Sequence, residues 1–541
     1  MSSVTPILRK LEFSTVWILW ISFYTYCCYQ VYLDSQTRKP LYQTHTKSLK
    51  SGLLSKYFPN LFYDVQDYEW SQWHQNLKDR IFFLAAHFVT LRTAAKYLKP
   101  HRYLNFWNIQ LLFGFSFATY FAGIKVISWL ILQMIVLQLT VKITKNKACV
   151  WMMAIFLIFS ISSEKLLNFF DGNLNGYYLV SQSNLRFISF CFDYLDALKM
   201  DENEGDSRDE KSEKTDSEKT DSEKTDSEKT DSKKFKFIEH LRYVFYFPIM
   251  LTGPWITYDK FYISRSKPTP EWSAEKSKYF GKQLFRFAVC MLMIDFLTSQ
   301  IYFSIMHIDL NFLKTTSYWT LVGLLFWHVQ FFYLKYHILY GMSAKYVEVD
   351  GILNCPKGPH CVISRPNHRE MWRFFDAGLH EWLLKYVFKP VVKFRGFDSE
   401  GSEQRRSSPL QLFIASVASF GFTFFWHVPQ MYTFYWVIMS LLGLTIEQIV
   451  CNVFLKKVPA NVKNSKFLFQ WLCAVFGCWS FSWILVTNMY FLGGVEVGHN
   501  YLKRIYTEDL WNLLVFKGFL VCGYWCSIGL REKHSAKDKV N

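Results

Sequence analysis

Residues 13–33 read FSTVWILWISFYTYCCYQVYL and contain no charged side chain. A helix needs roughly 20 apolar residues to cross the hydrocarbon core of a bilayer, so this stretch is long enough to span it. Arg9 and Lys10 precede the stretch, and no small-x-small cleavage motif follows it. We therefore expect a retained signal-anchor helix over 13–33 rather than a signal peptide that is removed.

Similar apolar stretches follow along the whole chain. They predict an all-α, polytopic membrane protein of about ten to twelve transmembrane or re-entrant helices. The composition agrees, because 51% of the 541 residues are hydrophobic and 19% aromatic. Only 19% are charged, against about 25% in soluble domains. The apolar stretches run from end to end, so we expect a single membrane domain over residues 1–541.

The charge of the chain is uneven. The net charge is +17 overall but −6 within residues 201–234, so the rest of the chain carries +23. Nucleic-acid binding is one interpretation of such basicity. The Lys and Arg residues mostly occupy short loops between apolar stretches, however, which is the positive-inside pattern of a cytoplasmic membrane face. We therefore expect membrane lipids, and no nucleic acid, as partners.

Two long polar segments interrupt the apolar pattern. Residues 201–234 include four copies of SEKTD between Ser212 and Asp231 and have no apolar side chain to bury, which predicts a disordered loop without a catalytic role. Residues 341–409 are rich in His, Arg, Lys and Gly and surround an apolar insertion at 371–392. Such a long connection is usually functional, so we expect it to contain a re-entrant catalytic segment.

Ionisable side chains inside apolar segments are costly, so each one is a candidate functional residue. Asp376 lies in EMWRFFDAGLHEWL, and His427 ends an uncharged run that begins at Gln411. A His in such a place can exchange a proton near neutral pH, and an Asp nearby can orient it or bind an amine. Each residue could equally be a packed side chain, and the spacing does not show that the two meet.

Several blocks of the sequence resemble the Hedgehog acyltransferase branch of the membrane-bound O-acyltransferase (MBOAT) superfamily. The central block is Cys361–Pro390, CVISRPNHREMWRFFDAGLHEWLLKYVFKP, and a later one is Phe420–His427, FGFTFFWH. The other blocks are Asp67–Trp73 (DYEWSQW), Leu185–Asp193 (LRFISFCFD), Tyr246–Phe261 (YFPIMLTGPWITYDKF) and Asn488–Gly498 (NMYFLGGVEVG). Because several blocks occur in the family's order, the resemblance covers most of the chain and implies the MBOAT fold.

The resemblance also implies a reaction. A palmitoyl or similar long-chain acyl group would pass from acyl-CoA to the N-terminal cysteine amine of a secreted Hedgehog-like protein. His427 matches the family's catalytic histidine, Asp376 its second catalytic residue, and Cys361 a cysteine that ligates haem iron; a free or acylated thiol is the alternative for Cys361. Trp372 and Trp426, near the two catalytic positions, would either line an acyl tunnel or simply pack.

The phosphates of coenzyme A call for a basic cytosolic rim. Lys385, Lys389 and Lys393 recur every four residues in LLKYVFKPVVKFR, and Arg395 follows them. These four residues are our candidates for CoA binding. Lysines that snorkel towards lipid headgroups would show the same spacing, and that alternative stays open.

The last five residues, from Lys537 to Asn541, read KDKVN. Lysines at the third and fifth positions from the end resemble a dilysine retrieval signal, so we expect a multi-pass protein of the endoplasmic reticulum membrane. Three other functions remain open at this point. They are O-acylation of a lipid or other small hydroxyl acceptor, proton-coupled transport through the Asp and His, and a scaffold that has lost its activity.

Overall fold

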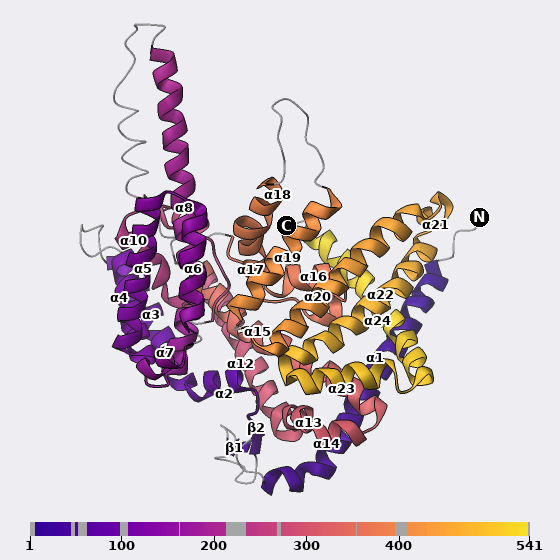
Figure 1. Cartoon of the computed structure of the whole chain (residues 1–541). Coiled ribbons are helices and arrows are strands. Elements are labelled where there is room, and N and C mark those ends of the chain that lie inside the picture. The colour runs from indigo at the N-terminus through magenta and orange to yellow at the C-terminus, as the bar shows by residue number, and fades with distance from the viewer. Residues whose placement is uncertain are drawn as a thin grey trace.

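Helices form most of the molecule in the computed structural model (Figure 1). The structure describes all residues except 1–5, 45–48, 52–61, 98–105, 162, 213–233, 251, 268–271, 353, 395–407, 428 and 539–541.

The elements follow one another along the chain in two runs. The first contains α1 (Pro6–Thr44), β1 (Leu49–Ser51), β2 (Phe62–Asp64), α2 (Tyr68–Gln75), α3 (Leu77–Tyr97), α4 (Phe106–Ala122), α5 (Ile124–Thr144), α6 (Lys147–Ile161), α7 (Glu164–Phe169), α8 (Leu174–Ser212), α10 (Phe237–Val244), the 3-10 turn η3 (Phe247–Ile249), α11 (Tyr258–Arg265) and α12 (Ala274–Gln300). The second contains α13 (Phe303–Ile308), α14 (Leu310–Thr315), α15 (Tyr318–Val349), the 3-10 turn η4 (Val362–Ser364), α16 (His368–Phe375), α17 (Ala377–Leu383), the π-turn η5 (Leu384–Phe388), α18 (Lys389–Phe394), α19 (Pro409–Trp426), α20 (Met431–Ile449), the turns η6 (Val450–Phe454) and η7 (Leu455–Lys457), α21 (Ala460–Asn464), α22 (Lys466–Gly493), α23 (Val495–Tyr506) and α24 (Leu510–Asp538).

The all-α prediction is correct except for one small antiparallel sheet, in which β1 pairs with β2 and Leu49 lies opposite Asp64. Each strand has three residues, which is too short for alternation to show in the sequence. Tertiary contacts hold the sheet in place. Asp64 accepts the backbone N–H groups of Ser304 at 2.7 Å and Ile305 at 3.2 Å, which ties β2 to the start of α13.

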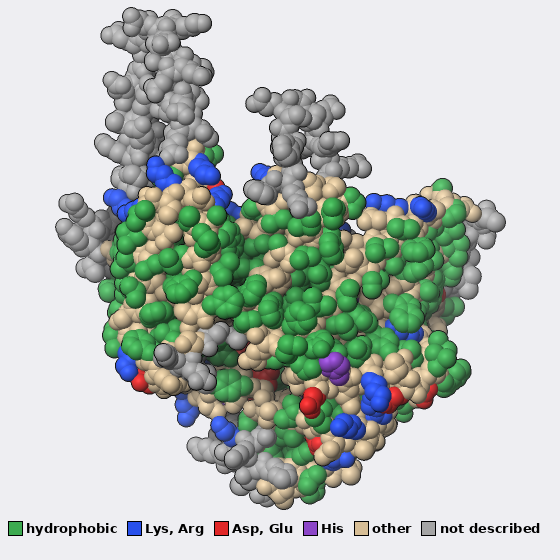
Figure 2. All heavy atoms as spheres, viewed as in Figure 1, with side chains coloured by type: hydrophobic (Ala, Val, Ile, Leu, Met, Phe, Trp, Pro, Cys, Tyr) green, Lys and Arg blue, Asp and Glu red, His purple; other side chains and the backbone are tan. Residues whose placement is uncertain are grey.

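Five helices within the described residues are long and apolar enough to cross a membrane. They are Ile124–Thr144, Pro409–Trp426, Met431–Lys457, Lys466–Gly493 and Leu510–Arg531. Figure 2 shows a broad apolar band on the face in view, with Lys and Arg side chains along its upper edge. A multi-pass membrane protein has such a surface. The larger total of ten to twelve helices stays a prediction, and α1 covers the expected anchor at 13–33 as one continuous helix.

The low-complexity segment begins differently from the prediction. α8 continues to Ser212, so residues 201–212 are helical instead of forming the start of a loop at 201–234. Extending a helix that already exists costs little, because only nucleation is strongly unfavourable. Residues 213–233, which hold nearly all of the SEKTD copies, lie outside the described residues.

The expected polar loop at 341–409 also differs in detail. α15 continues through Val349, the turn η4 follows, and four short helical pieces, α16, α17, η5 and α18, lie between His368 and Phe394. Residues 395–407 fall outside the described part of the chain. α19 then begins at Pro409 with a reciprocal capping box between Ser408 and Gln411, which fixes where the apolar run starts.

Two large apolar cores hold the helices together. In one, α1 packs against α15 and α24, so the first and last helices of the chain are neighbours (Figure 1). Phe23 stacks on Phe519 with ring centroids 4.1 Å apart, and Trp20 meets Phe326 edge to face at 5.8 Å. The other core joins α4, α5, α6, α8, α10 and α11. The short helices between α15 and α19 touch both cores.

Candidate active site

Asp376 stands at the break between two short helices. It ends α16 and is the N-cap of α17, where its Oδ1 accepts the backbone N–H of Leu379 at 2.9 Å. Asp is a preferred N-cap because its carboxylate satisfies a backbone donor that has no partner within the helix. The Tyr340 hydroxyl, from α15, also hydrogen-bonds to this carboxylate. The carboxylate is therefore held by two elements.

The other end of α16 is anchored by α20 and α22. Glu447 accepts the backbone N–H groups of His368 at 2.8 Å and Arg369 at 3.4 Å. Ser480 donates to the same carboxylate at 2.8 Å and lies 3.0 Å from the Nδ1 atom of His368. A negative charge is favourable at a helix N-terminus. Glu447 therefore stabilises α16 and, through it, the position of Asp376.

His427 caps the C-terminal end of α19, where its backbone N–H donates to the Thr423 carbonyl at 3.0 Å. Its imidazole lies among three aromatic rings: Trp426 at 4.6 Å, Trp436 at 5.5 Å and Phe491 at 5.3 Å between centroids. Among the described residues, no side chain makes a hydrogen bond to either ring nitrogen. The imidazole is thus oriented by packing, and its nitrogens are left for a reactant.

Aromatic contacts connect the two predicted catalytic residues, although no hydrogen bond or ion pair between described atoms joins them directly. Phe375, next to Asp376, stacks on Phe332 at 5.3 Å, and Phe332 meets Phe491 at 6.5 Å. Phe491 in turn packs against His427. The two residues therefore belong to one aromatic cluster.

Trp372 and Trp426, the tunnel candidates, have different surroundings. The Trp372 ring lies 5.2 Å from Trp436, which also contacts His427. The Trp426 indole N–H donates to the Ser181 carbonyl of α8 at 3.2 Å. Trp426 is thereby fixed to a neighbouring helix, whereas the Trp372 indole nitrogen is buried and has no hydrogen-bond partner among the described residues.

Residues 253–255, with the sequence GPW, follow η3 and lie against the start of α17. A Cβ on Gly378 would lie 2.5 Å from the Trp255 carbonyl oxygen and 2.6 Å from its nitrogen, so only glycine allows this contact. The Trp255 ring then lies 5.9 Å from Trp426. The block around Asp376 and the block ending at His427 are thus bridged by Trp255, a residue that the sequence did not single out.

Two acidic residues at the start of α2, Asp67 and Glu69, lie against α15, the helix that carries Tyr340. Lys335 donates to Asp67 at 2.9 Å and is 3.0 Å from Glu69, while the Tyr336 hydroxyl donates to Glu69 at 2.9 Å. Glu69 is also close enough to Tyr340 to act on it electrostatically. The DYEWSQW block is in this way joined to Asp376 through three polar residues of α15.

Cys361 begins the turn η4, and its thiol donates to the Gln330 side-chain oxygen at 3.3 Å. Within the part of the chain that the structure describes, no group of three or more His, Cys, Asp or Glu residues could hold a metal ion. A half-buried thiol already bonded to a side-chain amide gives no support to the haem that the resemblance implied. The chemistry below does not involve it.

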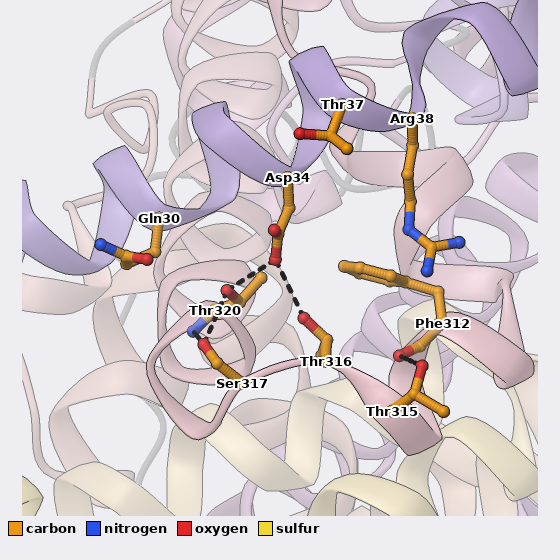
Figure 3. Close-up of a pocket in the computed structure, with 9 residues that line it drawn as sticks. All are labelled: Gln30, Asp34, Thr37, Arg38, Phe312, Thr315, Thr316, Ser317 and Thr320. Atoms are coloured by element: carbon orange, nitrogen blue, oxygen red, sulfur yellow. Dashed lines mark hydrogen bonds between the residues drawn. The ribbon is translucent and has the colours of Figure 1, made fainter.

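Two pockets of the described residues are not lined by Asp376. One, of about 340 Å³, lies between α1 and the segment joining α14 to α15 (Figure 3). Asp34 points into it and accepts the Thr316 and Thr320 hydroxyls at 3.0 and 2.8 Å. It contains none of the predicted site residues. A second, apolar pocket of about 500 Å³ is lined by Phe424 and four residues just beyond His427.

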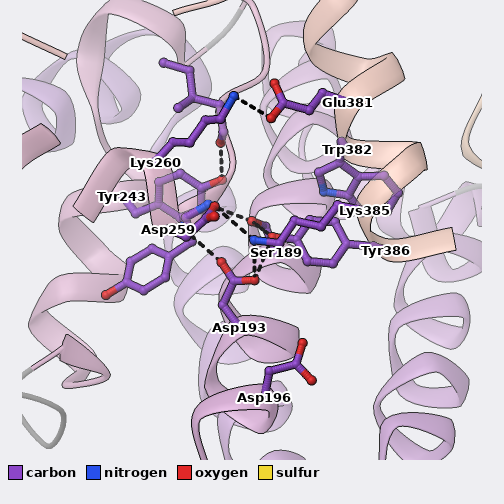
Figure 4. A network of polar contacts seen from close by, with 12 residues as sticks. Ser189, Asp193, Asp196, Tyr243, Asp259, Lys260, Glu381, Trp382, Lys385 and Tyr386 are labelled. Carbon is purple, nitrogen blue, oxygen red and sulfur yellow. Dashed lines mark hydrogen bonds and ion pairs between the residues drawn. The ribbon is translucent and has the colours of Figure 1, made fainter. Parts of the chain in front are cut away.

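The lysines proposed for CoA differ from one another. Figure 4 shows Lys385 between two carboxylates, with its Nζ 2.8 Å from Asp193 and 2.9 Å from Asp259. Its charge is already balanced, so it joins α8, α11 and η5. Lys389 and Lys393 are exposed, as a phosphate-binding rim would require. Arg395 lies outside the described residues.

Comparisons with known proteins show which family the chain belongs to. The family model of MBOAT, the membrane-bound O-acyltransferase family, matches residues 7–491. The mouse Protein-cysteine N-palmitoyltransferase HHAT is 30% identical over 288 residues, which are 52% of this chain and 55% of the mouse protein. The Drosophila melanogaster Protein-cysteine N-palmitoyltransferase Rasp is 25% identical over 318 residues, 57% of this chain and 59% of the fly protein.

The chain thus spans a little more than half the length of these two relatives. Membrane-bound O-acyltransferase gup1 of Schizosaccharomyces pombe is 22% identical over 467 residues, 82% of this chain and 75% of the yeast protein. The family match covers nearly the whole chain, including Asp376 and His427. This chain is therefore a member of the membrane-bound O-acyltransferase family.

Proposed function

We propose that this chain transfers palmitoyl, or a similar long-chain acyl group, from acyl-CoA to the N-terminal amine of a secreted protein that begins with cysteine. One observation carries the proposal: Leu185, Trp255 and Phe420, from three of the other blocks, contact the short helices around Asp376. The blocks at 67–73 and 488–498 reach the same region through side chains of α15 and through Trp436. The names of the mouse and fly relatives support protein acylation. We propose the endoplasmic reticulum membrane as its location, because the resemblance to the Hedgehog acyltransferase branch implies it.

The proposed reaction forms an amide and releases CoA. The acceptor nitrogen attacks the thioester carbonyl carbon, an N–C bond forms, and the C–S bond breaks. His427 accepts the proton that the attacking nitrogen loses and returns it to the leaving sulfur. Asp376 binds the acceptor ammonium and positions it opposite the thioester. The ammonium releases one proton to solvent before the attack, because only the neutral amine has a lone pair with which to attack the carbonyl carbon.

The surroundings of the two residues suit this role. Three aromatic rings pack against His427 and lower the polarity around it, so a hydrogen bond to the developing oxyanion is stronger than it would be in solution. Holding donor and acceptor in line can contribute about 7–11 kcal/mol to the acceleration. The clustered rings of Trp372, Trp436 and Phe491 provide apolar surface against which an acyl chain could lie.

A second candidate is O-acylation of a lipid or small hydroxyl acceptor. The yeast relative named as an O-acyltransferase aligns with 82% of this chain, more than the mouse and fly relatives do. His427 would serve a hydroxyl nucleophile equally well. The family match weighs against the transporter and scaffold alternatives, because MBOAT members are acyltransferases.

Acyl transfer in detergent micelles tests the proposal. Purified full-length protein is incubated with labelled palmitoyl-CoA and a synthetic peptide with a free N-terminal Cys. An N-acetylated peptide blocks the amine and controls for labelling of the thiol. Hydroxylamine then distinguishes an amide, which resists it, from a thioester, which it cleaves. His427→Ala is compared with His499→Ala, because His499 is exposed on α23.

We expect amide-linked label on the free peptide only, with a loss of roughly 10²–10⁴-fold in His427→Ala and none in His499→Ala. Label on neither peptide, from a protein that still melts cooperatively, would contradict protein acylation. Transfer to an added lipid hydroxyl under the same conditions would instead establish the second candidate.

A further inference from the structure

Two arginines, Arg242 and Arg265, donate hydrogen bonds to the same carboxylate, Glu239, in the part of the molecule that contains α8. Glu239 of α10 accepts a hydrogen bond from Arg242 on the same helix and another from Arg265 at the end of α11. The Arg242 and Arg265 side chains are 10% and 15% exposed. One carboxylate therefore faces two guanidinium groups, and a positive charge is left over in a mostly buried position.

Other cations lie beside this group. The Nζ of Lys234 is 5.8 Å from the centre of the Tyr262 ring, and the Arg265 guanidinium is 5.7 Å from the same ring. Lys236 and Lys267 are exposed next to α10 and α11. We call Lys234, Lys236, Arg242, Arg265 and Lys267 the basic cluster. Among the described residues, Glu239 is the only acid paired with it.

The guanidinium groups are not saturated by protein. Arg242 also donates to the Asn108 side chain of α4. The Nε atoms of Arg242 and Arg265 are buried and have no hydrogen-bond partner among the described residues. Arginine binds phosphate oxygens through paired N–H groups, and an excess of arginine over acid favours an anionic ligand.

The position of the basic cluster favours a lipid over a soluble ligand. Ile238 on α10 and Ile263 on α11 are 39% and 57% exposed. Ile238 precedes Arg242 by four residues, so apolar and cationic side chains share one face of α10. Figure 1 shows α10 beside α4 and α5, in the part of the molecule above which Figure 2 shows Lys and Arg side chains along the edge of the apolar band. A segment with such a face lies in the membrane interface.

We propose that the basic cluster binds the phosphate of an anionic phospholipid headgroup, with phosphatidylinositol phosphate or phosphatidic acid as the chemical class. The acyl chains of the lipid would lie along Ile238 and Ile263, and the phosphate would reach Arg265 and the flanking lysines. Basic pockets beside membrane helices commonly recognise such headgroups. The inference is independent of the acceptor specificity proposed above.

Lipid retention by the purified full-length protein tests this site. The protein is exchanged into neutral phosphatidylcholine nanodiscs with and without phosphatidylinositol 4-phosphate, and bound lipid is counted by native mass spectrometry. Arg265→Gln is compared with Lys457→Gln, because Lys457 is an exposed lysine on η7 that lies outside the basic cluster. Thermal melting in neutral nanodiscs confirms that each variant is folded.

We expect phosphatidylinositol 4-phosphate to bind about fivefold more weakly to Arg265→Gln and unchanged to Lys457→Gln. If Arg265→Gln does not fold, the double variant Lys236→Gln with Lys267→Gln removes only exposed charges and should weaken retention at least tenfold. Equal retention by the folded cluster variants and the wild type would overturn the site. Displacement of the lipid by adenosine 3′,5′-bisphosphate would overturn it in favour of a nucleotide site.

Discussion

At Asp376 the carboxylate receives hydrogen bonds from the backbone of Leu379 and from the hydroxyl of Tyr340. These contacts fix which way its oxygens point, and so they fix where an acceptor amine would be held. Tyr340 comes from a helix that ends well before Asp376 in the sequence. Its side chain is buried, so its phenol is a fixed part of the site.

Tyr340→Phe removes this hydroxyl and little else. We expect kcat/KM for the acceptor peptide to fall roughly tenfold, because a hydrogen bond to a charged group contributes about 1.5–3 kcal/mol. The KM for palmitoyl-CoA should stay unchanged. Steady-state kinetics with each substrate varied in turn provide the measurement, and Tyr333→Phe on the same helix is the control. A loss that is equal for both substrates would contradict a role in orienting Asp376.

Gly378 offers a test of the close contact with Trp255. Gly378→Ala places a Cβ against backbone atoms that cannot move aside. We expect a loss of about 1–3 kcal/mol in stability, seen as a lower melting temperature in detergent. Gly281→Ala in α12 meets no atom within 4 Å and should be neutral or slightly stabilising. Equal melting temperatures for the two variants would show that the contact is loose.

The sequence could propose Asp376 and His427 as candidates, since charged or titratable residues are conspicuous in apolar runs. It could not identify Tyr340 or Glu69, because their importance depends on partners that folding brings together. Lys335 and Asp67 are separated by 268 positions in the chain yet form an ion pair. A tyrosine in an aromatic-rich helix carries no local mark that distinguishes it from its neighbours.

At the scale of elements, the run of short helices from α16 to α18 is held at several points along its length. Glu447 fixes the start of α16, Asp376 caps α17, and Lys385 fastens η5 to α8 and α11. The sequence predicted a functional insertion at 371–392, but not that it would divide into four short pieces. The division depends on caps and ion pairs supplied by distant helices, and hydropathy does not contain that information.

The lysines of this segment should separate into two classes. Lys385→Gln leaves Asp193 and Asp259 close together without their shared cation, so we expect roughly 1–3 kcal/mol lower stability. Lys389→Gln should not change the melting temperature but should raise the KM for palmitoyl-CoA, if its exposed ammonium meets a CoA phosphate. Thermal melting and kinetics on both variants decide this. A raised KM for Lys385→Gln with unchanged melting would assign the CoA role to Lys385 instead.

At the scale of the whole molecule, the acidic tract is the run of SEKTD repeats at residues 213–231. Replacing residues 213–231 with a Gly-Ser linker of the same length should leave acyl transfer and the melting temperature unchanged. The reason is that the tract has no apolar side chain with which to join either core. The peptide acylation assay measures the effect directly. A large fall in rate at unchanged stability would reveal a regulatory role for its Ser and Thr residues.

The neighbouring positions of α1 and α24 have a consequence for how the protein is made. Phe23 of α1 stacks on Phe519 of α24, across 496 positions of sequence. At about 5–20 residues per second, a ribosome needs roughly 25–100 s to synthesise that interval. α15 is made before α24 and can pack against α1, but the part of α1 that contacts α24 lacks its partner until the end. Release of the last helix from the ribosome therefore completes a core that the first helix began, and a chain that stops before α24 leaves that core open.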